Sequence, residues 1–257
     1  MTVRIGTSGW QYADWRGAFY PEKMPQRLWL ERYASHFDVV EVNNTFYRLP
    51  AAEVFAQWRE RVPASFRFAL KLSRYISHIR RLREPAESMR TFLERAAQLG
   101  DRIGPLLLQL PPNFPVDPGR LEDALAAVPH RFRVAVEVRH ASWFREEVAA
   151  VLRRHDAALC LTDRCGEPQE PRWPTAGWGY LRFHQGAEGD WSYGERTLRD
   201  WASRVRSLWG EGADVHAFFN NDPGCAAVRD AAAFAQVCAE AGLAVSRVPD
   251  AGALRSV

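Results

Sequence analysis

Charged side chains occupy alternate positions near the ends of three short apolar runs. Glu137 and Arg139 are two residues apart in one run, Arg182 and His184 in another, and Glu41 is followed by an asparagine at the same spacing. Because residues two apart on a β-strand point to the same face, each pair is expected to project from one side of its strand. Charged groups are rarely buried without partners, so these pairs predict a polar cluster, either a reaction site or a structural salt-bridge network.

Two carboxylates and a lysine could perform acid/base catalysis at such a cluster. We assign Glu137 and Glu41 as the acid/base pair, because a carboxyl group in a partly desolvated site can have its pKa raised toward neutrality. Lys71 ends another apolar run and is, with Lys23, one of only two lysines among 34 Lys and Arg residues. Because the pKa of a lysine falls readily on burial, Lys71 joins the catalytic candidates together with His140.

Other polar and aromatic residues near the run ends are predicted to bind the substrate. Cationic side chains can hold an anionic group, amides can orient hydroxyls, and aromatic faces stack on sugar rings or nucleobases. The predicted substrate-binding residues are Trp10, Tyr12, Asn43, Asn44, Tyr47, Gln109, Arg139, Asp163, Arg182, His184, Asn220 and Asn221. Trp15, Phe19 and Tyr20 are instead expected to form a small core that holds their loop in place.

A single divalent metal is the alternative arrangement for part of this set. Its ligands would be Glu137, His140, Asp163 and His184. No dense ligand motif such as H-E-x-x-H is present, so we assign no metal and no other cofactor. The sequence also lacks the phosphate loop, the dinucleotide fingerprint and the G-x-S-x-G elbow, which argues against nucleotide-triphosphate hydrolysis, NAD-dependent hydride transfer and α/β-hydrolase chemistry.

Eight apolar runs that end in polar residues would position these side chains. They span residues 5–8, 39–44, 68–71, 106–109, 134–140, 159–163, 180–184 and 217–221. Helix-like segments separate most of them, which predicts an α/β fold, and eight such units predict a (β/α)8 TIM-type barrel with its site at the carboxyl ends of the strands. A loop over 164–177 is expected where a helix would follow the sixth strand. The rival architecture is an open doubly wound sheet.

Length and composition bound the class of protein. The 257 residues match a single barrel domain over 1–257, because such barrels take about 250 residues. No apolar stretch approaches the roughly 18 residues of a membrane span, so no membrane partner is expected. The amino terminus carries no leader pattern and the four cysteines show no paired spacing, which predicts a cytoplasmic protein. A net charge of +3 supports a nucleic-acid partner only weakly.

Several segments resemble those of the YecE-like family, a bacterial family of domains of unknown function. They are GTSGW (6–10), WRG (15–17), FYP (19–21), EVNNTFYR (41–48), FALK (68–71), QLPP (109–112), EVRH (137–140), SW (142–143) and FFNN (218–221). The resemblance spans nearly the whole chain in order and implies a TIM barrel with these residues at its strand ends. A relationship of the family to endonuclease-IV-like barrels has been suggested, but those enzymes hold a trinuclear zinc site whose ligand set three candidate histidines cannot supply.

The leading hypothesis is an enzyme that acts on a small, polar, phosphorylated sugar or nucleotide by acid/base chemistry, either hydrolysis or isomerisation. Its ligand would be a small anionic or sugar-like molecule. The second hypothesis is a metal-assisted phosphodiesterase that acts on nucleic acid, and the third is a non-catalytic module that binds a small ligand.

Overall fold

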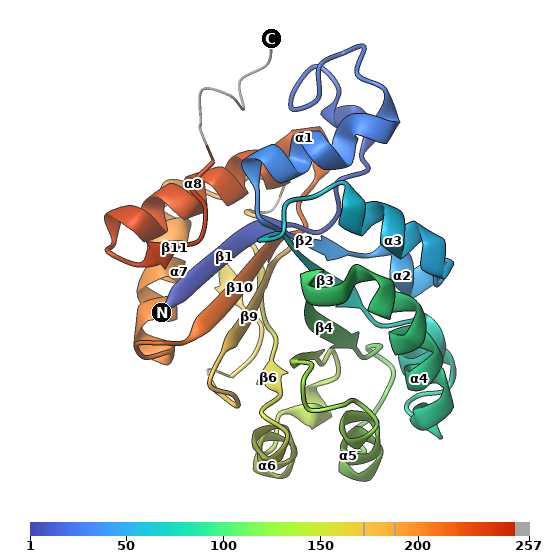
Figure 1. The fold of residues 1–257 in the computed structure, drawn as a ribbon. Coiled ribbons are helices and arrows are strands. Elements are labelled where there is room, and N and C mark those ends of the chain that lie inside the picture. The colour runs from blue at the N-terminus through green and yellow to red at the C-terminus, as the bar shows by residue number, and fades with distance from the viewer. Residues whose placement is uncertain (172, 188, 250–257) are drawn as a thin grey trace.

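Helices surround a set of central strands, and the two kinds of element alternate along most of the chain (Figure 1). The computed structural model describes residues 1–171, 173–187 and 189–249. The strands are β1 Thr2–Thr7, β2 Val39–Val42, β3 Arg67–Lys71, β4 Ile103–Gln109, β5 Val134–Glu137, β6 Ala158–Leu159, β7 Leu161–Arg164, β8 Glu167–Pro168, β9 Gly179–Phe183, β10 Asp214–Phe219 and β11 Ala244–Val245. The α-helices are α1 Trp29–His36, α2 Asn44–Tyr47, α3 Ala52–Glu60, α4 Pro85–Ala96, α5 Pro118–Ala126, α6 Glu146–Arg154, α7 Glu195–Leu208 and α8 Ala226–Glu240. The predicted α/β class is confirmed.

The strands form two sheets rather than one continuous ladder. The first has the order β11-β1-β10-β9-β7-β8, and the second has the order β2-β3-β4-β5-β6. Every strand pair is parallel except β7 with β8, so the first sheet is mixed. The break on one side falls at Cys160, because β6 pairs with β5 whereas β7 pairs with β9. Parallel strand–helix units are therefore confirmed, but a single closed barrel is not.

The junction between β1 and β2 is bridged by the side chain of Tyr33 from α1. Its buried phenol oxygen accepts a hydrogen bond from the Thr7 N–H at 2.9 Å and donates one to the Val39 carbonyl at 3.0 Å. Gly6 makes this approach feasible, because a Cβ at that position would lie 2.2 Å from the Val39 oxygen. A side chain thus satisfies backbone groups that a regular strand ladder would otherwise pair.

Local signals place the helices that follow the strands. The Asp117 carboxylate accepts from the Arg120 N–H at 3.1 Å and caps α5, whose first residue is a proline. A proline also opens α4, as expected from the fixed backbone angle of that residue. Between β7 and β9 the described residues contain no helix, which confirms the predicted loop, although β8 was not expected there. Helix α2 was not expected either, and it places Asn44 and Tyr47 on a short helix rather than on a strand end.

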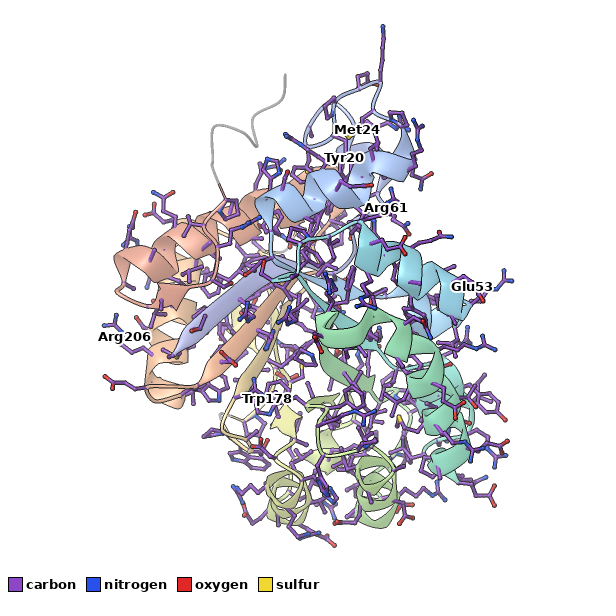
Figure 2. The ribbon with its side chains drawn as sticks, in the orientation of Figure 1. Tyr20, Met24, Glu53, Arg61, Trp178 and Arg206 are labelled. Carbon is purple, nitrogen blue, oxygen red and sulfur yellow. The ribbon has the colours of Figure 1, made fainter. Side chains whose placement is uncertain are left out.

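Aromatic packing holds the loop between β1 and α1. Trp15, Phe19 and Tyr20 are buried, as predicted for a small core. The Tyr20 ring stacks on Trp29 with the centroids 4.6 Å apart and the planes 3° from parallel. Figure 2 places Tyr20 and Met24 beside α1 at one edge of the molecule. The loop therefore brings its own apolar interior and leaves the strand ends free for polar side chains.

Replacing Tyr33 with Phe should lower the free energy of unfolding by about 1–3 kcal/mol, because the Thr7 N–H and the Val39 carbonyl would lose their partner in a buried junction. Thermal or urea unfolding followed by circular dichroism measures the loss. Tyr75→Phe is the control, since its ring is 48% exposed, and it should change stability by less than about 0.5 kcal/mol. Equal effects of the two substitutions would contradict the bridging role.

Candidate functional site

A fully buried arginine binds two buried carboxylates at the carboxyl ends of the strands. Arg182 of β9 donates to Glu41 of β2 from Nε at 3.0 Å and from Nη2 at 2.8 Å. Its Nη1 donates to Glu137 of β5 at 2.7 Å. All three side chains are at most 2% exposed. This network joins the two sheets, since β9 belongs to one and the two glutamates belong to the other.

Four further donors complete the hydrogen bonding of these two carboxylates. Around Glu41, a serine hydroxyl and a tyrosine hydroxyl each lie 2.7 Å from a carboxylate oxygen. Around Glu137, an amide lies at 2.8 Å and a second guanidinium at 2.9 Å. The donors are Ser8, Tyr180, Gln109 and Arg139. Such a satisfied network is the condition under which buried charges are tolerated.

The expectation that Glu41 and Glu137 have raised pKa values was wrong. Burial is the largest single effect and raises the pKa of both carboxyls, but the charge of Arg182 together with the other cations and hydrogen-bond donors around them holds each pKa below the ordinary value. For Glu137, the positive charge of Arg139 lowers the pKa further. Both groups are therefore ionised at neutral pH, and neither can act as a proton donor while Arg182 remains bound.

A cleft of about 610 Å³ lies at the carboxyl ends of the strands. The described residues that line it carry four cations, namely Lys71, Arg74, Arg139 and Arg182, and no carboxylate. Amide, aromatic and imidazole side chains supply the rest of its wall. They are Tyr12, Asn43, Asn44, Phe46, Tyr47, His78, Gln109 and Asn220. Eight of the predicted substrate-binding residues, together with Lys71, therefore meet at one cleft.

Lys71 provides a buried amine in this cleft. It is the last residue of β3, its side chain is 7% exposed, and its Nζ lies 4.3 Å from the centre of the Phe46 ring. Burial lowers the pKa of Lys71 to about 8, and the positive charge of Arg182 acts in the same direction. Among the described residues, no carboxylate forms an ion pair with this amine.

Besides Phe46, two residues of the cleft wall, Arg74 and His78, were absent from the predicted site. Arg74 directly precedes the π-helix Tyr75–Ile79 that follows β3, and His78 lies within this helix, where its ring packs edge-on against Phe46 at 4.9 Å. Burial, followed by the charge of Lys71, lowers the pKa of His78 to about 4, so the ring is neutral at pH 7. The available signal was their position directly after the strand that ends in Lys71.

A second cleft, of about 390 Å³, adjoins the first because Arg139 lines both. Glu137 and His184 also line it, so they face this neighbouring space rather than the cleft of Lys71. Burial, followed by Arg182, lowers the pKa of His184 to about 4. The predicted site at the strand ends is therefore divided between two clefts, and Arg139 forms part of the wall of both.

Glu170 is the titratable group that the sequence interpretation missed. It lines the second cleft, is 8% exposed, and accepts from the Thr162 N–H at 2.6 Å and from the Thr162 hydroxyl at 2.5 Å. Burial raises the pKa of Glu170 to about 7, because its two hydrogen bonds compensate only in part and the charge of Glu137 adds to the rise. Its position inside the predicted 164–177 loop gave no periodicity from which to identify it.

Besides Glu41, which is enclosed by the Arg182 network, four predicted site residues line neither of the two clefts. Trp10 is 3% exposed and packs edge-on against Trp58 at 5.3 Å. The Asp163 carboxylate accepts from the Trp201 ring N–H at 2.7 Å and from a loop N–H, and the Asn221 amide donates to a carboxylate of α8 at 2.6 Å. His140 accepts from the Ser142 N–H and caps a short helical turn. These residues pack or anchor the elements around the site.

The alternative metal set does not assemble. The described part of the chain contains no group of three or more His, Cys, Asp or Glu side chains able to hold a metal ion. Asp163 already accepts hydrogen bonds at both carboxylate oxygens, and His140 bonds to Ser142. The donor atoms that a metal would need are therefore used in local contacts.

Comparison with known proteins identifies the family of the chain. Residues 4–253 match the family described as protein of unknown function DUF72. The chain belongs to this family. It is 43% identical over 143 residues to the protein YecE of Escherichia coli K12, a match that covers 55% of this chain and spans about half, 50%, of that protein. It is 23% identical over 259 residues to YunF of Bacillus subtilis 168, which covers 86% of this chain and 89% of that protein.

Solved structures of the same family share the fold. A DUF72 family protein from Thermotoga maritima MSB8 superimposes with a TM-score of 0.79 at 28% identity and covers 92% of this chain and 98% of its own. One from Enterococcus faecalis V583 gives a TM-score of 0.78 at 21% identity, with 97% and 98% of the two chains covered. The YecE-like resemblance is confirmed. Within the described residues, none of the helices combines the length and apolarity needed to cross a bilayer.

Arg182→Met should lower the free energy of unfolding at pH 7 by about 3–5 kcal/mol, because Glu41 would remain buried without an ion-pair partner and Glu137 would keep only Arg139. For a domain of this size that is a fall in melting temperature of roughly 6–20 °C. The deficit should shrink in acid. The native carboxyls have lowered pKa values and lose their stabilising contribution as pH falls below the ordinary value of 4.5, whereas the variant folds more readily once they are protonated.

Arg206→Met is the matched control for this substitution. Figure 2 shows Arg206 on α7 at the outside of the molecule, so its replacement should change stability by less than about 0.5 kcal/mol. A variant of Arg182 that melts like the wild type at pH 7, or whose deficit grows in acid, would exclude the network as the main electrostatic support.

Glu170→Gln should change the pH dependence of stability. Because the folded pKa of about 7 exceeds the ordinary 4.5, this glutamate favours folding below pH 4.5 and its contribution is lost as pH rises through 7. Glutamine does not titrate, so the variant should gain on the order of 1–3 kcal/mol relative to the wild type between pH 5 and pH 8. Urea unfolding across this range measures the gain, and Glu167→Gln, at an exposed position, is the control. Parallel curves of stability against pH for the wild type and both variants would refute the prediction.

Proposed function

We propose that the protein is an enzyme that binds a small, polar, phosphorylated sugar or nucleotide in the 610 Å³ cleft and transforms it by acid/base chemistry. The observation that carries the proposal is the charge of the wall, since four described lining residues are cationic and none is acidic. Lysine and arginine bind phosphate strongly when no carboxylate competes for them, and among the described residues Lys71 and Arg74 form no ion pair, unlike the other two cations of the wall. The amide side chains of Asn43, Gln109 and Asn220 offer donors and acceptors for hydroxyl groups.

A comparison within the molecule supports the choice of this cleft. Another cleft, of about 310 Å³, lies at the opposite ends of the strands and is also lined by arginines. There, Arg133 pairs with Asp214 at 2.9 Å and Arg4 pairs with Asp38 at 3.3 Å. An acidic side chain in a cleft wall repels an added anion, and Asp214 lines that cleft whereas none of the described residues lining the carboxyl-end cleft is acidic, so the carboxyl-end cleft is the better anion site.

The roles within the acid/base chemistry differ from those first assigned. Glu41 and Glu137 are ionised and bound to Arg182, so they hold the cations in position rather than exchange protons. Lys71 and Glu170 have pKa values of about 8 and about 7, which are the values that proton transfer near neutral pH requires. We assign Lys71 as the base of the main cleft and Glu170 as the acid of the adjoining one.

We also infer that the two sheets are the two arcs of one eight-stranded barrel. A parallel bridge between Ser8 and Glu41 links β1 to β2, and a single residue, Cys160, separates β6 from β7. Arg182 of one sheet bonds to Glu41 of the other, which places both inner faces around the same charges. In such a barrel the active site lies at the carboxyl ends of the strands, in agreement with the position of the cleft.

Glucose 6-phosphate should bind the wild-type protein with a dissociation constant of about 1 mM or tighter, whereas glucose should bind more weakly, because most of the affinity comes from the phosphate. Isothermal titration calorimetry at low ionic strength measures both, and added salt should weaken the binding. Arg74→Gln should weaken it roughly tenfold, since one charge-assisted hydrogen bond is lost. Exposed Arg145, which lines neither cleft, is the control as Arg145→Gln. Absence of any phosphate or sugar-phosphate binding at millimolar concentration would refute the proposal.

A further inference from the structure

The main cleft contains a lysine, Lys71, although anion binding by itself does not require a lysine. An anion could be held by arginine alone, and 32 of the 34 cationic residues of this chain are arginine. The cleft nevertheless presents a lysine, Lys71, while the other lysine, Lys23, is an exposed residue of the loop before α1. Guanidinium stays protonated in proteins and is not a nucleophile, whereas a neutral primary amine attacks carbonyl carbons.

We propose that Lys71 forms an imine with the carbonyl group of an anionic ligand, so that the substrate class is a phosphorylated aldehyde or ketone, including the open-chain form of a sugar phosphate. This inference rests on the proposed function, because it places the carbonyl in the same cleft and the phosphate on the same cations. It goes further in assigning a covalent intermediate and the atom that forms it, and it gives Lys71 the role of nucleophile in place of the role of base.

The geometry around Lys71 leaves the amine available. Its backbone is fixed, since the Thr45 hydroxyl donates to the Lys71 carbonyl oxygen at 2.7 Å. Its Nζ faces the Phe46 ring at 4.3 Å, and an aromatic ring can take no proton from it. Because the described residues offer this amine no ion pair, deprotonation breaks no salt bridge. The cleft of about 610 Å³ leaves room for a ligand of several heavy atoms beside it.

Burial also favours the neutral form of the Lys71 amine. It lowers the pKa of this amine to about 8, so roughly a quarter of the molecules carry the free amine at pH 7.5, against about one in a thousand for an ordinary lysine. The charged side chains that act on this pKa are Glu41, Glu137, Arg139 and Arg182, and Arg74 and His78 line the same cleft. The two carboxylates are bound to arginines, which limits how far they stabilise the ammonium form.

The reaction balances without a further reagent. The Nζ lone pair attacks the carbonyl carbon, the π electrons move to the oxygen, and a proton passes from nitrogen to that oxygen to give a carbinolamine. Loss of the hydroxyl group with a second proton from nitrogen then releases one water molecule and leaves the C=N bond. The protonated imine withdraws electrons from the adjacent carbon, which makes a proton on that carbon acidic and suits isomerisation.

Reductive trapping of the wild-type protein tests the inference. Glyceraldehyde 3-phosphate is incubated with the protein and sodium cyanoborohydride at pH 7.5, and peptide mapping by mass spectrometry locates the adduct, which adds the mass of the aldehyde less one oxygen atom. Lys71 should be modified at least about tenfold faster than Lys23, because its amine is more often neutral and lies in the anion-binding cleft. The rate should rise with pH around a midpoint near 8.

Four controls separate this inference from the proposed function. Glyceraldehyde, which lacks the phosphate, should label Lys71 more slowly, and glycerol 3-phosphate, which lacks the carbonyl, should bind and protect it. Lys23→Arg should leave the labelling of Lys71 unchanged, and Lys71→Arg, checked for folding by its melting curve, should abolish it.

Contrary results are distinct from one another. Binding of glycerol 3-phosphate without an adduct at Lys71 overturns the imine and leaves the proposed function intact. Failure of glycerol 3-phosphate to bind overturns both. Equal labelling of the two lysines, or labelling by glyceraldehyde as fast as by its phosphate, overturns the assignment of an anionic carbonyl substrate.

Discussion

The structure depends on the enclosure of one arginine between two carboxylates. Arg182 is fully buried, and a buried guanidinium is tolerated only when counter-ions satisfy it with good geometry. Glu41 and Glu137 come from β2 and β5, which belong to the other sheet. The position of β9 relative to β2 and β5 is therefore fixed by charge as well as by apolar packing. Removal of any of the three leaves an uncompensated charge in the interior.

The same network determines the electrostatics of the cleft. Arg182 and Arg139 form ion pairs with the buried carboxylate of Glu137, and no acidic side chain is among the described residues that line the main cleft. The charges of Arg139 and Arg182 are balanced by the carboxylates of Glu41 and Glu137, so among the described lining residues Lys71 and Arg74 carry the positive charge that no ion pair compensates. The charge of Arg182 also lowers the pKa of Lys71 and of His184. Arg182, whose contacts support the structure, thus also affects the protonation states of Lys71 and His184, which line the clefts.

The charge of Glu137 acts on a titratable group in each of the two adjoining clefts, and it raises the pKa of both Lys71 and Glu170. Its negative charge adds to the burial that raises the pKa of Glu170, while its bond to Arg182 leaves it ionised. Two neighbouring carboxyls consequently have separated pKa values, an arrangement that divides proton donors from fixed charges. The shared wall at Arg139 allows a ligand anchored in the main cleft to extend toward Glu170.

The amino-acid sequence by itself determined the α/β class, the approximate positions of the main strands and the chemical character of the strand ends. Period-two alternation, Asp117 with its following proline and the polar tails are local signals, so they could be interpreted without tertiary contacts. The tertiary structure decided what those side chains do. Whether Glu41 is a proton donor or a counter-ion depends on Arg182, which is 141 residues away in sequence. The pKa of Glu170 depends on burial by a loop without periodicity, and the separation of the strands into two sheets depends on Tyr33 and Cys160. Burial and charge proximity are properties of the folded arrangement, because each is set by residues that the chain brings together only in three dimensions.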